Sequence, residues 1–154
     1  MTSPRKVRVD TTFSADQRAE LLAAARPDEL VPLAERLFID GALGELTVVK
    51  PPQVGLVLMQ VREPVAEERF YLGEVLVTDC TVELRGAAGW SMRGGEDRMA
   101  GLAAAILDAV AAAGDEHAGE VEELCRRVAA RREREHAAEW DEIAPTTVVF
   151  EELT

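Results

Sequence analysis

The sequence predicts an α+β fold in which an antiparallel β-meander packs against helices. Short runs rich in Val, Leu and Thr occupy residues 46–85, whereas segments with apolar residues at helical spacing precede and follow them. The chain has 154 residues, 47% of them hydrophobic, which suffices for one domain with a real core but not for two ordinary domains. We therefore expect a single domain over residues 1–154, with residues 1–12 as a flexible N-terminal segment.

The N-terminal part is predicted to be a helical hairpin. Ser14 and Gln17 have the form of a capping box, and the helix that they begin should stop at Pro27. Asp28 can cap a second helix with an apolar stripe along one side. Proline lacks the amide that an inner turn needs, so Pro32 fits this helix only near its first turn.

Four strands are expected in the middle of the chain, separated by prolines and an acidic turn. Alternation is clearest near the end of this region, where Val82 and Leu84 point one way and the polar residues between them point the other. One face of the sheet should therefore be wet, with the helices covering the dry face. The predicted strands are residues 46–50, 55–62, 69–78 and 80–85.

Two helices should follow the sheet. Residues 97–113 repeat apolar side chains at helical spacing, and their small residues allow close approach to a sheet, so they form the predicted central packing helix. A second, long helix should begin at Glu116 and include residues 131–136, which are charged almost all round and must be solvated or bound to a partner. After Pro145, residues 146–150 are predicted to form a β-rich tail that could add to the edge of a sheet.

The charge of the chain excludes several classes of partner. The formal net charge is -12, from 29 acidic and 17 basic residues, so the overall field repels nucleic acid, anionic membranes and free nucleotides. No apolar stretch follows the basic residues at the start of the chain, which argues against a signal peptide and a membrane-spanning helix. We expect a cytoplasmic protein that binds no nucleic acid and does not insert into membranes.

The two cysteines are expected to be reduced and packed in the core. Cys80 lies in a strand-like run and Cys125 in a helical one, with no CxxC pair and no nearby histidine. This pattern favours neither a disulfide nor a zinc site. We therefore predict no metal ligands in this chain.

The sequence contains none of the common motifs of a self-contained active site. A GxxxxGK[ST] phosphate loop, a GxGxxG loop, HExxH and GxSxG are all missing. The two histidines, His117 and His136, lie among charged residues of the last helix and are expected to be solvated. We therefore predict no catalytic residue.

The turn from Gly94 to Asp97 is the most plausible place for an anion. A flexible turn there would deliver backbone amides to a helix N-terminus, where a phosphate can bind. Glu96 and Asp97 already supply negative charge, which favours the alternative that they cap the helix. A further hypothesis is an independent enzyme in which arginines hold a small anion and Asp97 acts as base. The candidate anion-binding residues are Arg69, Arg93, Gly95 and Arg98.

A series of short signatures carries a resemblance to a known family. The signatures are Gly55-Leu56-Val57, Arg69-Phe70, Gly73-Glu74, Val77-Thr78, Val82, Leu84, Gly89 before Ser91, Gly95, Asp97, Asp108 and Ala109. In this order they resemble the PhnG family, the G subunit of the bacterial carbon-phosphorus lyase complex. The resemblance extends from the region of Pro27 to Leu153.

The resemblance implies a role in an assembly that lets bacteria use phosphonates as a source of phosphorus. In that family the G, H and I subunits, with the L protein, attach an alkylphosphonate to ribose C1 of ATP and displace adenine. The implied partners are the H, I and J subunits, and self-association is a further option. No cofactor is expected on this chain, because an acidic domain without a nucleotide motif is poorly suited to gather ATP and a phosphonate, which the complex would handle.

The chain departs from the family pattern at several positions that are expected to be basic. Asp79 and Glu83 stand where related sequences tend to carry arginine, and Glu96 replaces the arginine of a Gly-Arg-Asp turn. These acidic replacements favour an alternative function, a stand-alone homo-oligomeric binding or regulatory domain derived from the family.

Exposed apolar side chains would be the anchors of an accessory subunit. Aromatic residues within the domain are expected in the core, with an interface role as the alternative, whereas for Trp140 and Phe150 the two are weighted equally. The Val-x-Phe-Phe pattern at the family's C-terminus is matched by Val148 and Phe150, but Glu151 replaces the second Phe. The candidate partner-binding residues are Phe70, Tyr71, Trp90, Trp140, Val148 and Phe150, with Met92 as a further anchor.

Overall fold

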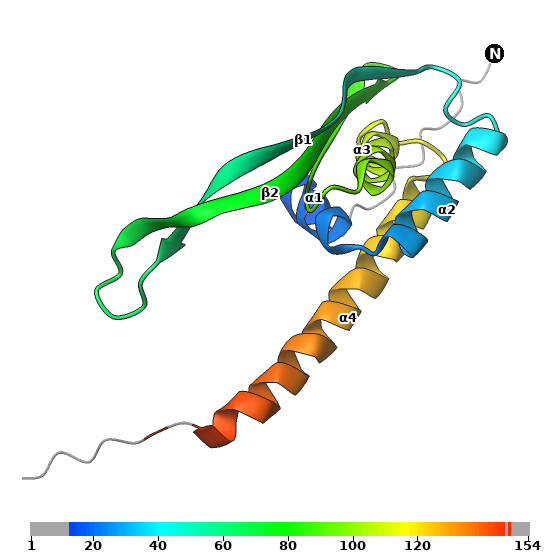
Figure 1. The fold of residues 1–154 in the computed structure, drawn as a ribbon. Helices are drawn as coiled ribbons and strands as arrows, with labels where there is room; N and C mark the ends of the chain where they lie inside the picture. Colours follow the sequence, from blue (N-terminus) through cyan, green and yellow to red (C-terminus); the bar gives the residue numbers. More distant parts are fainter. Residues whose placement is uncertain (1–12, 147, 149–154) are drawn as a thin grey trace, which may run out of the picture.

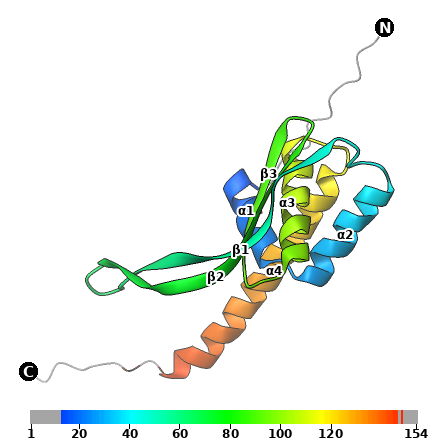
Figure 2. The ribbon, with the colours of Figure 1, turned by 45° about the horizontal axis from the view of Figure 1, so that its top comes forward.

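The computed structural model describes residues 13–146 and residue 148, so the prediction for residues 1–12 lies outside the described residues. Helix α3 lies against one face of a three-stranded antiparallel sheet, and the other helices surround it (Figure 1, Figure 2). The elements are α1 (Ala15–Ala24), α2 (Pro27–Ile39), β1 (Leu46–Arg62), β2 (Arg69–Leu84), β3 (Ala87–Gly94), α3 (Arg98–Ala112), α4 (Ala118–Ile143) and the 3-10 turn η1 (Ala144–Thr146). The predicted α+β class, with an antiparallel sheet against helices and a long C-terminal helix, is confirmed.

Helix α1 begins as predicted. The Ser14 hydroxyl accepts a hydrogen bond from the Gln17 amide, and the Gln17 side chain accepts one from the Ser14 amide, which completes the capping box. Leu22 of α1 and Leu30 and Leu37 of α2 are fully or almost fully buried. The two helices follow each other in the chain as expected, and each packs against α3.

Helix α2 begins earlier than predicted. Arg26, not Asp28, is the N-terminal cap residue, and its amide donates to the Glu29 carboxylate at 2.8 Å. Pro27 takes the first helical position, where a missing amide leaves no bond unmade. Pro32 therefore lies beyond the first turn, and the packing of the apolar face of α2 against α3 holds the helix in spite of it.

In the part of the chain that the structure describes the sheet has three strands, so the prediction of four strands over residues 46–85 was wrong. Residues 46–50 and 55–62 belong to one strand, β1, which runs through Pro51 and Pro52. This is possible because β1 is an edge strand, and register shifts between Lys50 and Gln53 absorb the prolines. The two later predicted strands likewise join as β2.

Strand β3 was not predicted, because its small residues and glycines lack the usual composition of a strand. It returns along β2 through a two-residue turn at Arg85 and Gly86, which have φ of 49° and 81°. A Cβ on Gly89 would lie 2.2 Å from the carbonyl oxygen of Ala105, so only glycine allows this close contact with α3. The Ser91 hydroxyl also donates to the backbone oxygen of Gly101 on α3, at 2.6 Å.

The core surrounds α3, and the sheet and helices α1, α2 and α4 all contribute buried side chains to it. Cys80, Val82 and Leu84 of β2 are fully buried, whereas Glu83 between them is exposed. The predicted alternation of a dry and a wet face is therefore confirmed for this stretch. All residues from 103 to 110 of α3 are buried, so α3 is the central packing helix that the sequence predicted.

Helix α4 starts two residues later than predicted and buries Val121, Leu124 and Val128. Both cysteines are free and buried, as expected. Burial raises the pKa of the Cys80 thiol, and it raises the pKa of Cys125 to about 12. No helix among the described residues combines the length and the apolar character that crossing a membrane requires.

Candidate functional site

The β1–β2 hairpin extends well beyond the body of the protein. The pairing of β3 with β2 ends where Gly94 lies opposite Val77, whereas β1 and β2 stay paired as far as Arg62 and Arg69. We call residues 53–76 the arm. Figure 1 and Figure 2 both show the arm as a long two-stranded ribbon that projects away from the packed helices of the body. From Val77 to Arg69 the strand rise corresponds to roughly 26 Å, and a lone two-stranded hairpin is at best marginally stable in water.

One face of the arm continues the face of the sheet that packs on α3. Thr78 touches that helix, and Leu76 lies two residues before it on the same side of β2. Leu76 pairs directly with Leu56, which is 60% exposed, and Leu58 is 61% exposed. Tyr71 joins this face through its pairing with Gln60. The core face of the sheet thus continues along the arm, where no element among the described residues covers it.

The opposite face of the arm is apolar too. Val57 pairs with Val75, and Val61 pairs with Phe70, which is 45% exposed. Met59, between the two valines of β1, adds to the same row. A sheet with one solvated face alternates apolar and polar residues, but this segment is apolar on both sides. Its composition is that of a strand pair buried on both faces.

A second projection is formed by the end of α4. Arg131 donates to Glu29 at 2.6 Å and to the backbone oxygen of Ala24 at 3.0 Å, which holds the middle of the helix against the body. Residues 137–143, which we call the free helix end, form no side-chain hydrogen bond or ion pair with residues 13–130, and the Thr146 hydroxyl that donates to the Ile143 carbonyl belongs to the same end of the chain. Trp140 and Ile143, three residues apart, are 66% and 56% exposed there.

Four of the six candidate partner-binding residues lie on these two projections and on the sheet. Phe70 and Tyr71 lie on opposite faces of the arm, and Trp140 is on the free helix end. Trp90, 44% exposed, pairs with Thr81 on the face of the sheet away from α3. Core placement was thus the wrong expectation for Phe70, Tyr71 and Trp90. Met92 is half-buried.

The C-terminal tail is only partly described. Thr146 belongs to the 3-10 turn and not to a strand, and Val148 is 70% exposed. Residues 147 and 149–154, including Phe150, lie outside the described residues.

Sequence reasoning missed the leucines of the arm. Leu56, Leu58 and Leu76 occur in strand-like runs, where an apolar residue is read as core by default. The available signal was the near absence of charge at both even and odd positions of residues 53–61 and 70–76, where Glu74 is the single charged residue.

The candidate anion-binding arginines are not brought together. Arg69 lies near the tip of the arm, whereas Arg93 pairs with Thr78 at its base. The Arg93 guanidinium is buried and donates to the backbone oxygens of Leu22, Ala23 and Ala25, so it caps the C-terminal end of α1. Burial lowers the pKa of this guanidinium.

The amides of the turn before α3 are occupied as well. The Asp97 carboxylate accepts the Ala100 amide at 2.9 Å, which confirms that it caps the helix. The Gly95 amide donates to the backbone oxygen of Leu76, and the Gly95 carbonyl accepts the Thr78 hydroxyl at 2.8 Å. Arg98 is exposed at the first position of α3. This arrangement stabilises the turn itself and offers little to an anion.

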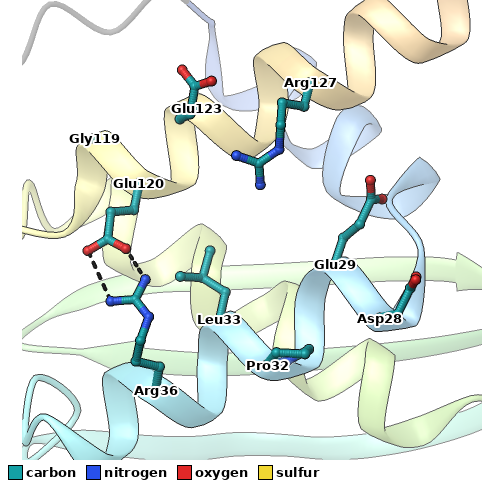
Figure 3. Close-up of a pocket in the computed structure, with 9 residues that line it drawn as sticks. All are labelled: Asp28, Glu29, Pro32, Leu33, Arg36, Gly119, Glu120, Glu123 and Arg127. Carbon is teal, nitrogen blue, oxygen red and sulfur yellow. Dashed lines mark hydrogen bonds and ion pairs between the residues drawn. The ribbon is translucent and has the colours of Figure 1, made fainter.

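A polar groove of about 660 Å³ lies between α2 and α4 (Figure 3). Arg36 and Glu120 bridge one end of it, and the Arg127 side chain points into it from α4. Carboxylates outnumber guanidinium groups in its lining, so it is not suited to concentrate phosphates. Its charged residues are Asp28, Glu29, Glu120, Glu123, Arg36 and Arg127.

His117 is not the solvated helix residue that was expected. It is the N-terminal cap residue of α4, its side chain is 19% exposed, and its Nδ1 lies 2.9 Å from a carboxylate oxygen of Glu120. This hydrogen bond raises the pKa of His117 above its ordinary value. His136 is exposed, as expected.

Two further observations concern acidic groups. Within the described range, no three His, Cys, Asp or Glu side chains are grouped so that they could hold a metal ion. Asp79, one of the acidic replacements, forms an ion pair with Lys50 across the β1–β2 ladder, so a basic residue of the same chain offsets its charge. Glu83 and Glu96 are exposed.

These features define a small α+β protein whose two long projections expose apolar side chains and whose described basic side chains mostly bind groups of the same chain. Such an architecture is that of a subunit that docks on other proteins. The model of the family described as phosphonate metabolism protein PhnG matches residues 15–154, so the chain belongs to this family. The resemblance drawn from the short signatures is confirmed.

A curated relative agrees with this assignment. The chain is similar to the alpha-D-ribose 1-methylphosphonate 5-triphosphate synthase subunit PhnG of Rhizobium meliloti (strain 1021), with 35% identity. The similarity covers 75% of this chain and 82% of the relative.

Proposed function

We propose that this chain is an accessory subunit of the carbon-phosphorus lyase core complex and supports the synthesis of ribose 1-methylphosphonate 5-triphosphate. In that reaction a phosphonate oxygen forms a bond to ribose C1 of ATP, the bond from C1 to adenine breaks, and adenine leaves with a proton. The supporting comparisons are the PhnG family match and the relative that is named as a subunit of this synthase.

The observation that supports a docking role is the exposure of apolar side chains on both faces of the arm. Leu56, Leu58 and Tyr71 on one face, and Phe70 on the other, are each 45% to 64% exposed on a hairpin that leaves the body. Exposed apolar area of this extent is costly in water and marks an interaction site. A partner subunit would cover it and stabilise the hairpin.

The free helix end supplies a second contact. Trp140 and Ile143 would enter an apolar groove of a partner as helix anchors. Acidic residues surround them, because Glu139, Asp141 and Glu142 lie in the same two turns. A groove with basic residues at its rim would fit this helix, and such a partner would also complement the net charge of -12.

The catalytic groups would come from another subunit. The candidate arginines of this chain do not converge on one site, since Arg93 caps α1 and Arg69 lies near the tip of the arm. ATP and the phosphonate would therefore be bound by the complex and not by this chain alone. Partners with this role are the H, I and J subunits, of which the I subunit would carry the active site.

The test is purification of the tagged chain from its own cells, grown with methylphosphonate as the sole phosphorus source. Stoichiometric H, I and J subunits in the eluate are the expected result. A homo-oligomer without these subunits, in cells that express them, would contradict the proposal and favour a stand-alone domain.

A further inference from the structure

We infer that the arm is held in a two-walled apolar slot of a partner subunit, with the tip of the hairpin emerging into water on the far side. The inference rests on the proposed function, because it describes how the subunit is held in its complex. It assigns a different environment to each part of the arm. The two faces of its shaft, residues 53–61 and 70–76, should be buried, and the tip, residues 63–68, should stay solvated.

The two faces of the shaft give the first argument. Leu56 and Leu58 lie on one face, and Val57 and Met59 lie on the other. A hairpin that lies flat on a partner buries one face, and polar residues then occupy the other. Here each face has its own apolar cross-strand pair, Leu56 with Leu76 and Val57 with Val75. Covering both pairs requires two walls.

The same observation argues against a second copy of the chain as the occupant. Two arms related by a two-fold axis could stack face to face, or pair edge to edge through β1. Stacking would cover one face of each arm, and edge pairing would cover neither. The net charge of -12 also opposes close self-association, and it opposes contact with an anionic membrane.

The distribution of polar groups gives the second argument. The tip satisfies its own backbone, because the Glu63 carboxylate accepts the amides of Val65 and Ala66, at 2.7 and 2.5 Å. Val65 is 90% exposed, and Glu67 and Glu68 add charge beside it. The shaft, in contrast, has only Glu74 as a charged residue, and Arg62 and Arg69 lie between the shaft and the tip. The slot should therefore be apolar with one basic group opposite Glu74, and the tip should project beyond it.

Cysteine labelling of the assembled complex tests this placement. Leu56→Cys and Val57→Cys put a thiol on each face of the shaft, and Val65→Cys puts one at the tip as a matched control. The native Cys80 and Cys125 are fully buried, so the introduced thiol reacts first. Compared with the free chain, maleimide labelling at positions 56 and 57 should slow by about ten-fold or more in the complex, because reaction then requires local opening. Labelling at position 65 should be unchanged.

Charge insertion gives an independent readout. Leu56→Lys and Val57→Lys should each reduce recovery of the complex by about ten-fold, because either lysine would be buried without a partner. Val65→Lys should leave recovery unchanged. Circular dichroism of the free variants should show melting of the body as in the parent chain, since these side chains lie outside the core.

The outcomes separate this inference from the proposed function. Protection of both faces with a reactive tip supports the slot. Protection of one face only, or equal labelling in the free chain and the complex, overturns the slot while leaving the subunit role intact. If the tip is protected together with both faces, the part of the inference that places the tip in water is wrong. Failure of the unmodified chain to co-purify with any of the H, I and J subunits would instead overturn the proposed function.

Discussion

Arg18 Nε lies 2.7 Å from Asp108 Oδ1, and the side chains of both residues are buried. The second carboxylate oxygen of Asp108 accepts the Trp90 amide at 3.0 Å. One carboxylate of α3 therefore connects α1 and β3, two elements that also contact each other through Arg93. This connection matters for the arm as well, because β3 pairs with the part of β2 that lies on the body.

Replacing the carboxylate should destabilise the body. We expect Asp108→Ala to lower the free energy of unfolding by about 3–5 kcal/mol, because it leaves the Arg18 charge buried without a partner. Urea unfolding followed by circular dichroism measures this change. Asp108→Asn keeps the shape and an acceptor for the Trp90 amide, so its smaller loss isolates the charge. Equal stability of Asp108→Ala and the parent chain would contradict the role of the pair.

Gly89→Ala should also destabilise the body, through a steric effect. The new Cβ would lie 2.2 Å from the Ala105 carbonyl oxygen and 2.4 Å from the Ala109 amide nitrogen, so β3 must move away from α3. We expect a loss of at least about 2 kcal/mol in unfolding free energy, at the upper range of overpacking. Gly94→Ala is the matched control in the same strand, because nothing lies within 4 Å of a Cβ there. The melting temperatures of the two variants test this prediction, because only Gly89→Ala should melt below the parent chain.

Arg93 should act as a structural residue. Arg93→Met removes the donors to the three carbonyls at the end of α1, and we expect a loss of about 2–3 kcal/mol. Arg98→Met, at an exposed position, should leave the melting temperature near that of the parent chain. If Arg93 instead holds an anion, added phosphate should raise the melting temperature of the parent chain and not that of Arg93→Met.

Stability should depend on the protonation of His117. The pKa of His117 in the folded state is raised, chiefly by the hydrogen bond to Glu120. The imidazole therefore binds a proton more tightly in the folded state than in the unfolded state. The resulting stabilisation is fully present below the unfolded pKa, about 6.5, and is lost as pH rises through the folded value. Melting temperatures of the parent chain and His117→Gln, compared from pH 5 to 8, should therefore converge toward high pH. His136→Gln removes an exposed histidine of the same helix and serves as the control.

The native thiols should be unreactive while the body is folded. Cys80 and Cys125 are fully buried, and burial raises the pKa of both, to about 12 for Cys125. At pH 8 we expect reaction with a thiol reagent to follow unfolding in rising urea, because the thiolate forms only when the core opens. Rapid reaction of either cysteine in the absence of urea would show that the core is more open than the structure indicates.

Several features could be predicted from the sequence because short stretches of chain determine them. The capping box of Ser14 and Gln17 and the Asp97 cap involve residues three apart, and the local backbone sets their geometry. The alternation of Cys80, Val82 and Leu84 with polar residues marked the buried face of β2 in the same way. The order of the short signatures was enough to indicate the family.

The tertiary structure alone decided which apolar and charged residues are covered. Leu56 and Val82 both lie in strand-like runs, but α3 covers the sheet at Val82 and does not reach Leu56. Arg93 was a candidate for binding an anion until the end of α1 was found against its guanidinium. Burial and hydrogen bonding depend on which distant segments pack together, and a local sequence pattern contains no record of that packing.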